Sequence, residues 1–140
     1  MVASWERLTS VTADGNTSAG AGLSTGTFTP KKYMKVKMYI MSSTDMQFRV
    51  GTGGTIDTGS NYSARNSNAG GSDNTDASAT HAQLGSFSSN ANGAWAECDI
   101  INVAGEEKVF IQHTVSIPST GAGTAPYRTE NVSKWTNTSG

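Results

Sequence analysis

The stretch YMKVKMYIM, residues 33–41, shows the clearest strand pattern in the chain. One alternating set of its side chains is apolar and rich in methionine: Met34, Val36, Met38 and Ile40. The other set carries lysine and tyrosine. Alternation with a period of two predicts a half-buried β-strand whose apolar set faces the core. Flexible methionines fill an irregular core well; a methionine-rich interaction surface is the alternative interpretation.

Similar patterns follow on the C-terminal side. Residues 46–50 alternate after a turn-like segment at 42–45, which predicts a hairpin with residues 33–41. Residues 94–101 have a set of small or apolar side chains, which allow a second sheet to approach closely. This set is Ala94, Ala96, Cys98 and Ile100, and the opposite set is Trp95, Glu97, Asp99 and Ile101.

Residues 109–117 predict a further strand. One alternating set is mostly apolar and is expected to face the core: Val109, Ile111, His113, Val115 and Ile117. On this assignment His113 is a core histidine, hydrogen-bonded to a loop carbonyl or a carboxylate. A ligand-binding or pH-sensing role is the alternative for His113.

The two ends of the chain are patterned more weakly. Residues 3–11 alternate impurely, as a first or edge strand does, around Trp5. The last part of the chain, residues 119–140, predicts a loop that runs into a short strand anchored by Val132 and Trp135.

Residues 51–93 consist almost wholly of Gly, Ser, Thr, Asn, Asp and Ala. Such a composition offers little apolar surface to offset the entropy of ordering the chain. The stretch therefore predicts a long polar loop excursion, pinned to the body of the protein at a few apolar residues. These residues are Ile56, Tyr62, Leu84 and Phe87.

The length and composition of the chain limit the possible fold classes. A chain of 140 residues fits one domain, residues 1–140. Its hydrophobic content of 35% is low, and no segment has helical periodicity. Short strands separated by turn clusters predict an all-β protein: an antiparallel, jelly-roll-like β-sandwich with long Gly/Ser/Asn-rich loops.

Charge and hydropathy exclude several partners. The net charge is −1, and the ten Lys and Arg are scattered, which argues against a nucleic-acid ligand. No run approaches the roughly 20 apolar residues of a membrane span. The N-terminus also lacks a basic segment followed by an apolar one, so no signal peptide is predicted.

The chemistry-bearing residues favour a protein that is not an enzyme. The single cysteine, Cys98, cannot form an internal disulfide, so a reducing compartment is expected. It is expected to be a small core residue rather than a nucleophile, because no motif ties it to His81 or His113 as a base. Glu97 and Asp99 share a strand face, as a glycosidase pair could, but no cleft is implied.

No metal or cofactor is expected, and one calcium site is kept as an alternative. Asp73 and Asp76, with Asp57 nearby in sequence, offer oxygen ligands on a Gly-rich segment without the EF-hand spacing. Solvated turn carboxylates are the simpler explanation of these aspartates.

Two arginines are candidates for ordering the polar loops. Arg65 lies near Tyr62 and Arg128 lies beside Tyr127, so each guanidinium could bond loop carbonyls and stack on a ring. Partner binding by these residues, together with Trp135, is the alternative.

Three segments carry a family resemblance: SNYSARNSNAGGSDNTDAS at 60–78, INVAGEEKVFIQHTVS at 101–116, and GAGTAPYRTENVSKWTNTS at 121–139. In this order and spacing they resemble a family of small tailed-bacteriophage virion structural proteins common in environmental phage genomes. The resemblance implies a jelly-roll or sandwich module that decorates and stabilises the outer surface of the head. It also implies a homo-oligomer that binds the major capsid protein or other virion proteins and is made in the host cytoplasm. A receptor-binding or carbohydrate-binding module of a tail fibre or head fibre is the alternative.

The resemblance carries one further expectation. Members of the family continue past a motif similar to KWTNTS with a Gly-rich turn and a closing strand, whereas the sequence here ends at Gly140. An open sheet edge near residue 140, completed by a neighbouring subunit, is therefore expected, with the strand around Trp5 as a second edge.

Overall fold

The computed structural model describes residues 5–12, 22–42, 46–85 and 90–139. This part of the chain is all-β, with antiparallel pairing and no helix, which confirms the predicted fold class. The strands are β1 (Tyr33–Ser42), β2 (Met46–Phe48), β3 (Gly51–Thr52), β4 (Thr55–Ile56), β5 (Tyr62–Asn68), β6 (Asn74–Ala79), β7 (Ala82–Gly85), β8 (Asn90–Ile101), β9 (Lys108–Ser116) and β10 (Tyr127–Trp135).

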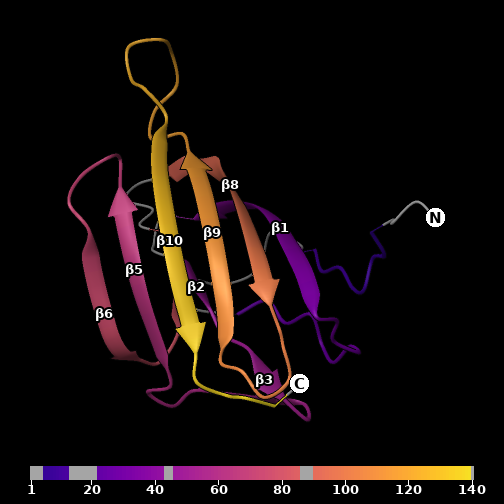
Figure 1. The fold of residues 1–140 in the computed structure, drawn as a ribbon. Coiled ribbons are helices and arrows are strands. Elements are labelled where there is room, and N and C mark those ends of the chain that lie inside the picture. The colour runs from indigo at the N-terminus through magenta and orange to yellow at the C-terminus, as the bar shows by residue number, and fades with distance from the viewer. Residues whose placement is uncertain (1–4, 13–21, 43–45, 86–89, 140) are drawn as a thin grey trace.

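The strands form one large sheet, a two-stranded pair that makes a small second layer, and a separate two-stranded pair, β3-β4. The large sheet has six strands in the order β1-β8-β9-β10-β5-β6, so that β1 and β6 are its edges (Figure 1). The second layer is the pair β2-β7, in which β7 contacts β9, β10 and β5. We call the face of the large sheet that β7 covers the inner face, and the opposite one the outer face. The result is a sandwich-like fold with unequal layers.

The core lies between these layers. Its buried cluster consists of Tyr62, Ala82, Leu84, Cys98, Ile100, Phe110 and Trp135. Phe48 of β2 meets Phe110 edge-on, with 5.3 Å between ring centroids. Met34, Val36 and Met38 of β1 are half-buried against this cluster, as their alternation predicts.

The predicted hairpin between residues 33–41 and 46–50 is wrong. β1 pairs with β8, and β2 pairs with β7 in the second layer. The alternation identified the apolar side of each strand correctly. It could not identify the partner, because period-two alternation is the same whichever strand lies alongside.

The prediction of a long loop at residues 51–93 is also wrong, although Phe87 lies outside the described residues. The stretch contains β3 to β7, and β5 pairs on both sides, with β10 and β6. Tyr62, Ala64 and Asn66 of β5 are buried. Tyr62 and Leu84 do anchor the stretch in the core, as predicted. Hydrogen bonds from polar side chains order it further, and composition alone does not show such bonds.

These hydrogen bonds join inner-face side chains to β7. Thr114 Oγ1 donates to the carbonyl oxygen of Leu84 at 2.7 Å, and Asn131 Nδ2 donates to that of Gln83 at 2.5 Å. Asn66 Nδ2 donates to the Gln83 side chain at 3.2 Å. Buried polar groups are tolerated when they are bonded in this way, so a polar inner face holds β7 in place.

The face assignment of residues 109–117 is inverted in the structure. Ile111 is 50% exposed and His113 is exposed, whereas Phe110 is fully buried. The pairing of Ile100 with Phe110 places Phe110 on the same side as the inward apolar residues of β8. The buried set of β9 is mostly polar, with Phe110 as its one apolar member, so the number of apolar residues in a set was a poor guide to burial. His113 is therefore not a core histidine.

The predicted edges are wrong as well. Residues 5–12 form no strand, and residues 3 and 4 lie outside the described part. β10 is an interior strand, between β9 and β5, so the end of the chain at residues 127–135 is not an open edge. The edges of the large sheet are β1 and β6.

Candidate functional site

The outer face of the large sheet carries a group of exposed apolar side chains. Trp95 is 45% exposed, Val115 38% and Val132 53%, and all three lie on interior strands. Tyr33 and Tyr39 of β1 and Ile111 of β9 are exposed as well. Isolated exposed apolar residues are common, but a contiguous patch marks an interaction site. The outer face is therefore the candidate binding surface.

The pairing register arranges these side chains in two apolar rows across the sheet. Tyr39 lies opposite Trp95, which lies opposite Val115 of β9. Four residues from Val115 along β9, Ile111 lies opposite Val132 of β10. Side chains opposite one another on neighbouring strands are about 5 Å apart at Cβ, so each row is continuous across its strands.

A charged row separates the two apolar rows. It runs across the sheet as Lys37, Glu97, His113 and Glu130, as the strand register shows. His113 thus lies between two glutamates on an exposed surface.

The charges near β1 pair with one another within the face. Lys35 Nζ lies 3.0 Å from Asp99 Oδ1 and 3.4 Å from Glu97 Oε2, and Lys37 Nζ lies 3.2 Å from Glu97 Oε1. The hydrogen bond to Asp99, opposed by partial desolvation, raises the pKa of Lys35. The hydrogen bonds from Lys37 and then Lys35 lower the pKa of Glu97. Glu97 and Asp99 are thus engaged as ion-pair partners on the exposed face.

The arginines lie on strands rather than in loops. Arg65 is on the outer face of β5 and pairs with Asp73 at 3.7 Å, and Arg128 on β10 pairs with Glu130 at 3.6 Å. Tyr62 of the same strand as Arg65 is buried on the inner face. In the described part of the chain, neither guanidinium has a hydrogen bond to a loop carbonyl or a contact with an aromatic ring. The structure does not bring Arg65 and Tyr62 together.

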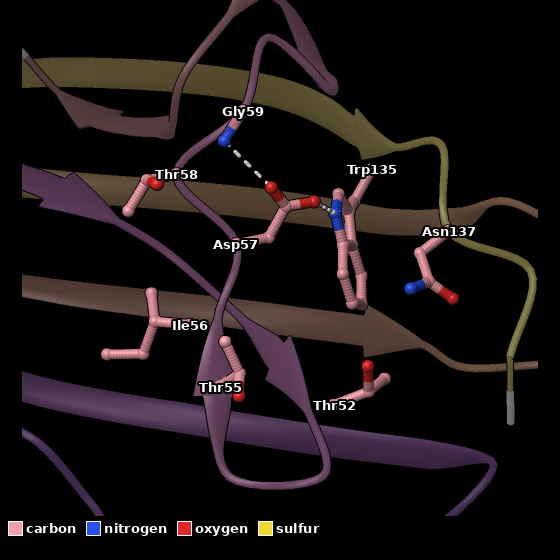
Figure 2. A pocket seen from close by; sticks show the side chains of 8 residues that line it. All are labelled: Thr52, Thr55, Ile56, Asp57, Thr58, Gly59, Trp135 and Asn137. Carbon is pink, nitrogen blue, oxygen red and sulfur yellow. Dashed lines mark hydrogen bonds between the residues drawn. The ribbon is translucent and has the colours of Figure 1, made fainter.

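Tyr62 and Trp135 instead form a second arrangement with Asp57. Their rings stack at 6.2 Å between centroids and 14° between planes. The Tyr62 hydroxyl accepts from the Val50 backbone N–H and lies within donor reach of the Val50 carbonyl oxygen, each at 3.1 Å. The Trp135 Nε1–H donates to Asp57 Oδ2 at 2.6 Å (Figure 2).

The Asp57 carboxylate has further donors. Gly59 N–H donates to Oδ1 at 2.8 Å, and Asn61 Nδ2 lies 2.9 Å from Oδ2. The bond from Trp135, followed by those from Asn61 and Gly59, lowers the pKa of Asp57. Its acceptor capacity is taken up within the protein, so Asp57 holds the segment between β4 and β5 onto the end of β10.

A polar hollow of about 330 Å³ lies beside this carboxylate. It is lined by Thr52, Thr55, Ile56, Asp57, Thr58, Gly59, Trp135 and Asn137, and Figure 2 shows the Asp57 carboxylate pointing to Trp135 and Gly59. The indole of Trp135 is only 4% exposed and stacks on Tyr62. It offers no free face on which a sugar ring could stack.

The aspartates considered for calcium are separated. Asp57 is bonded to Trp135, Asp73 pairs with Arg65, and Asp76 is on β6 beside a second hollow that includes His81. The described residues contain no group of three or more His, Cys, Asp or Glu arranged to hold a metal ion.

Cys98 lies on the inner face of β8 and is fully buried. Burial raises the pKa of its thiol to about 12. The placement as a small core residue is confirmed, and the thiolate needed for nucleophilic chemistry is not formed near neutral pH.

Sequence reasoning missed the outer-face residues Trp95, Ile111, Val115 and Val132 as a binding surface. The available signal was that strands 94–101 and 109–117 carry large apolar residues in both alternating sets. A sheet with apolar residues on both faces needs a partner on each.

Within the described ranges, no helix has the length and apolar character needed to cross a membrane. Comparison of the chain with protein-family models, with curated proteins and with solved structures found no match.

Proposed function

We propose that this chain is a non-enzymatic structural protein of a bacteriophage particle that docks on the outside of the head and reinforces it. The outer face of the six-stranded sheet is the docking surface in this proposal. The observation that carries it is the pair of exposed apolar rows, one of Tyr39, Trp95 and Val115 and the other of Ile111 and Val132, which flank the charged row on one face of the sheet. The three sequence segments that resemble virion proteins support the choice of particle.

The electrostatics of the outer face favour a protein surface as the partner. Lys35 and Lys37 are neutralised by Glu97 and Asp99 within the face, and the net charge of the chain is −1. A face of this kind makes no strong demand for an oppositely charged ligand. Apolar contact therefore supplies most of the affinity, and binding should depend only weakly on salt.

The test is saturation binding of purified protein to undecorated heads at several salt concentrations. We expect saturation at a copy number that follows that of the major capsid protein. Ile111→Asp should weaken binding at least tenfold, because it places a charge in the apolar patch. Ile56→Asp is the matched control, since Ile56 is 53% exposed but lies on β4, outside the six-stranded sheet.

Two outcomes would contradict the proposal. Saturation at a few copies per particle, or tight binding to isolated host-surface glycans, would favour the receptor-binding module of a fibre. Equal loss of binding in the two aspartate variants would show that the outer face is not the docking surface.

A further inference from the structure

β1 is a long and regular open edge. It pairs with β8 from Tyr33 opposite Ile101 to Ile40 opposite Ala94 without a break in register. Among the described residues no strand pairs with its other side. Edge strands with unpaired backbone groups are sites for the addition of another strand.

The direction of the free backbone groups follows from one hydrogen bond. The N–H of Asn102 donates to the carbonyl oxygen of Lys32 at 2.8 Å, so the backbone groups of Lys32 point toward β8. In an antiparallel strand these groups alternate in direction. The backbone groups of residues 33, 35, 37, 39 and 41 therefore point out from the edge.

Natural edge strands commonly carry lysines, which block the addition of another strand. β1 carries Lys35 and Lys37, but both side chains reach back over the sheet toward β8. Each is held there by a carboxylate at 3.0 to 3.2 Å, Asp99 for Lys35 and Glu97 for Lys37. The two lysine side chains are thus turned away from the free edge of β1 and do not block the addition of a strand there.

The other edge of the sheet suits strand addition less well. The pairing of β6 with β5 has a register irregularity between Tyr62 and Ala64. Ser78 of β6 has a φ of 53°, which is not an extended conformation. An irregular edge presents its backbone groups out of line, so β1 is the edge that can accept a strand.

We propose that the free edge of β1 pairs antiparallel with β1 of a second copy of this chain, with Met38 of one copy opposite Met38 of the other. This contact is independent of the particle docking proposed above, since it uses the edge of the sheet and leaves the outer face open.

The side chains of β1 select this register. It places Val36 opposite Ile40 of the second copy on the inner face, and Lys37 opposite Tyr39 of the second copy on the outer face. The next possible two-fold register places Lys37 opposite Lys37 of the second copy, and like charges directly opposite one another are unfavourable. A register centred on Val36 would pair Lys35 with Lys37 twice. A register centred on Tyr39 also keeps the lysines apart, but it pairs only residues 36–42 of the two strands, whereas the register centred on Met38 pairs residues 34–42. The register centred on Met38 therefore forms the longest pairing in which no lysines lie opposite one another.

The contact also covers apolar surface. Met34, Val36 and Met38 are only half-buried, because the second layer is narrower than the large sheet. Strand pairing continues the large sheet past β1 and brings the same residues of the second copy alongside. A two-fold contact of this kind is closed, so it yields a dimer rather than a filament.

The first test measures mass by sedimentation as protein concentration rises. We expect the native chain to approach twice its monomer mass. Lys37→Pro removes an N–H that points out from the edge and should shift the mass to that of a monomer. Lys37→Thr loses the same ion pair but keeps the N–H, and it should still dimerise. Unchanged circular dichroism of both variants shows that the sheet is intact.

The second test addresses the register by disulfide formation in air. Residues opposite one another in a non-hydrogen-bonded pair have Cα atoms about 4.5 Å apart, which suits a disulfide. Met38→Cys should therefore yield mainly cross-linked dimer on a non-reducing gel, and Val36→Cys at least tenfold less. The buried Cys98 should not contribute. Cross-linking by Lys37→Cys in place of Met38→Cys would overturn the register, and a monomer at every concentration would overturn the proposal.

Discussion

The indole Nε1–H of Trp135 donates a 2.6 Å hydrogen bond to Asp57 Oδ2, and so joins residues 78 positions apart in the chain. Trp135 is the last residue of β10, and Asp57 follows β4 directly. The contact fixes the segment that leads into β5 against the C-terminal end of an interior strand. It gives the protein an acid-sensitive contact at one end of the sheet.

Asp57→Asn should lower the melting temperature at neutral pH, because the amide is a weaker acceptor than the carboxylate for three donors. The hydrogen bonds lower the pKa of Asp57 below its ordinary value of 3.8. The carboxylate therefore stabilises the fold above that value, and its contribution is lost as the pH falls through the lowered pKa. Melting curves from pH 7 to pH 2 should show the difference between the two proteins shrinking at the acid end. A difference that stays constant with pH would contradict the role given to the charge.

Phe110→Ala should destabilise the protein by about 3–5 kcal/mol, the usual cost of removing a fully buried phenylalanine. Its neighbour Ile111 faces outward, so Ile111→Asp should cost only about 1 kcal/mol through the low strand propensity of aspartate. Urea unfolding of both variants measures the two costs. If Ile111→Asp fails to fold while Phe110→Ala is mild, the inner and outer faces of β9 have been exchanged.

Cys98 should resist thiol reagents in the folded protein, since it is fully buried and burial raises the pKa of its thiol to about 12. Its labelling rate at pH 8 should follow the unfolded fraction as urea is added. Mass spectrometry after a timed pulse of iodoacetamide gives that rate. Rapid modification without urea would show that the inner face of β8 is open to solvent.

Arg65→Lys and Arg128→Lys should both be nearly silent, with changes in stability below about 0.5 kcal/mol. Each guanidinium makes an exposed ion pair at 3.6 to 3.7 Å with a carboxylate, and lysine can form a similar pair. Limited proteolysis should give the same fragments as the native chain. New cleavage in either variant would restore the loop-ordering role predicted from the sequence.

The features of the fold that could be predicted from the sequence are those that depend on a single strand. The inward set of 33–41, led by Val36, and the buried Cys98 were predicted correctly, because alternation reports directly which side of a strand is apolar. The partner of β1 was not, because pairing depends on residues elsewhere in the chain. Ile111 was misplaced because the buried set of β9 is mostly polar and its more apolar set faces outward.

The candidate site was less predictable for the same reason. Arg65 was taken for a loop residue because Asn, Ser and Gly surround it, yet β5 is an interior strand. On its inner side Asn66 donates to Gln83, a bond between residues 17 positions apart in the sequence. The contact between Asp57 and Trp135 carries no local pattern at all.

The polar inner face also bears on how the protein avoids misassembly. An apolar strand can slide by two residues along an apolar sheet and still bury most of its surface. β7 cannot slide in this way. A slip would break the hydrogen bonds from Thr114 to Leu84 and from Asn131 to Gln83 and leave both donors unpaired. The segments that flank β7 are also poor in the apolar residues that make unfolded chains adhere to one another. Directional bonding thus sets the position of the second layer to within one residue.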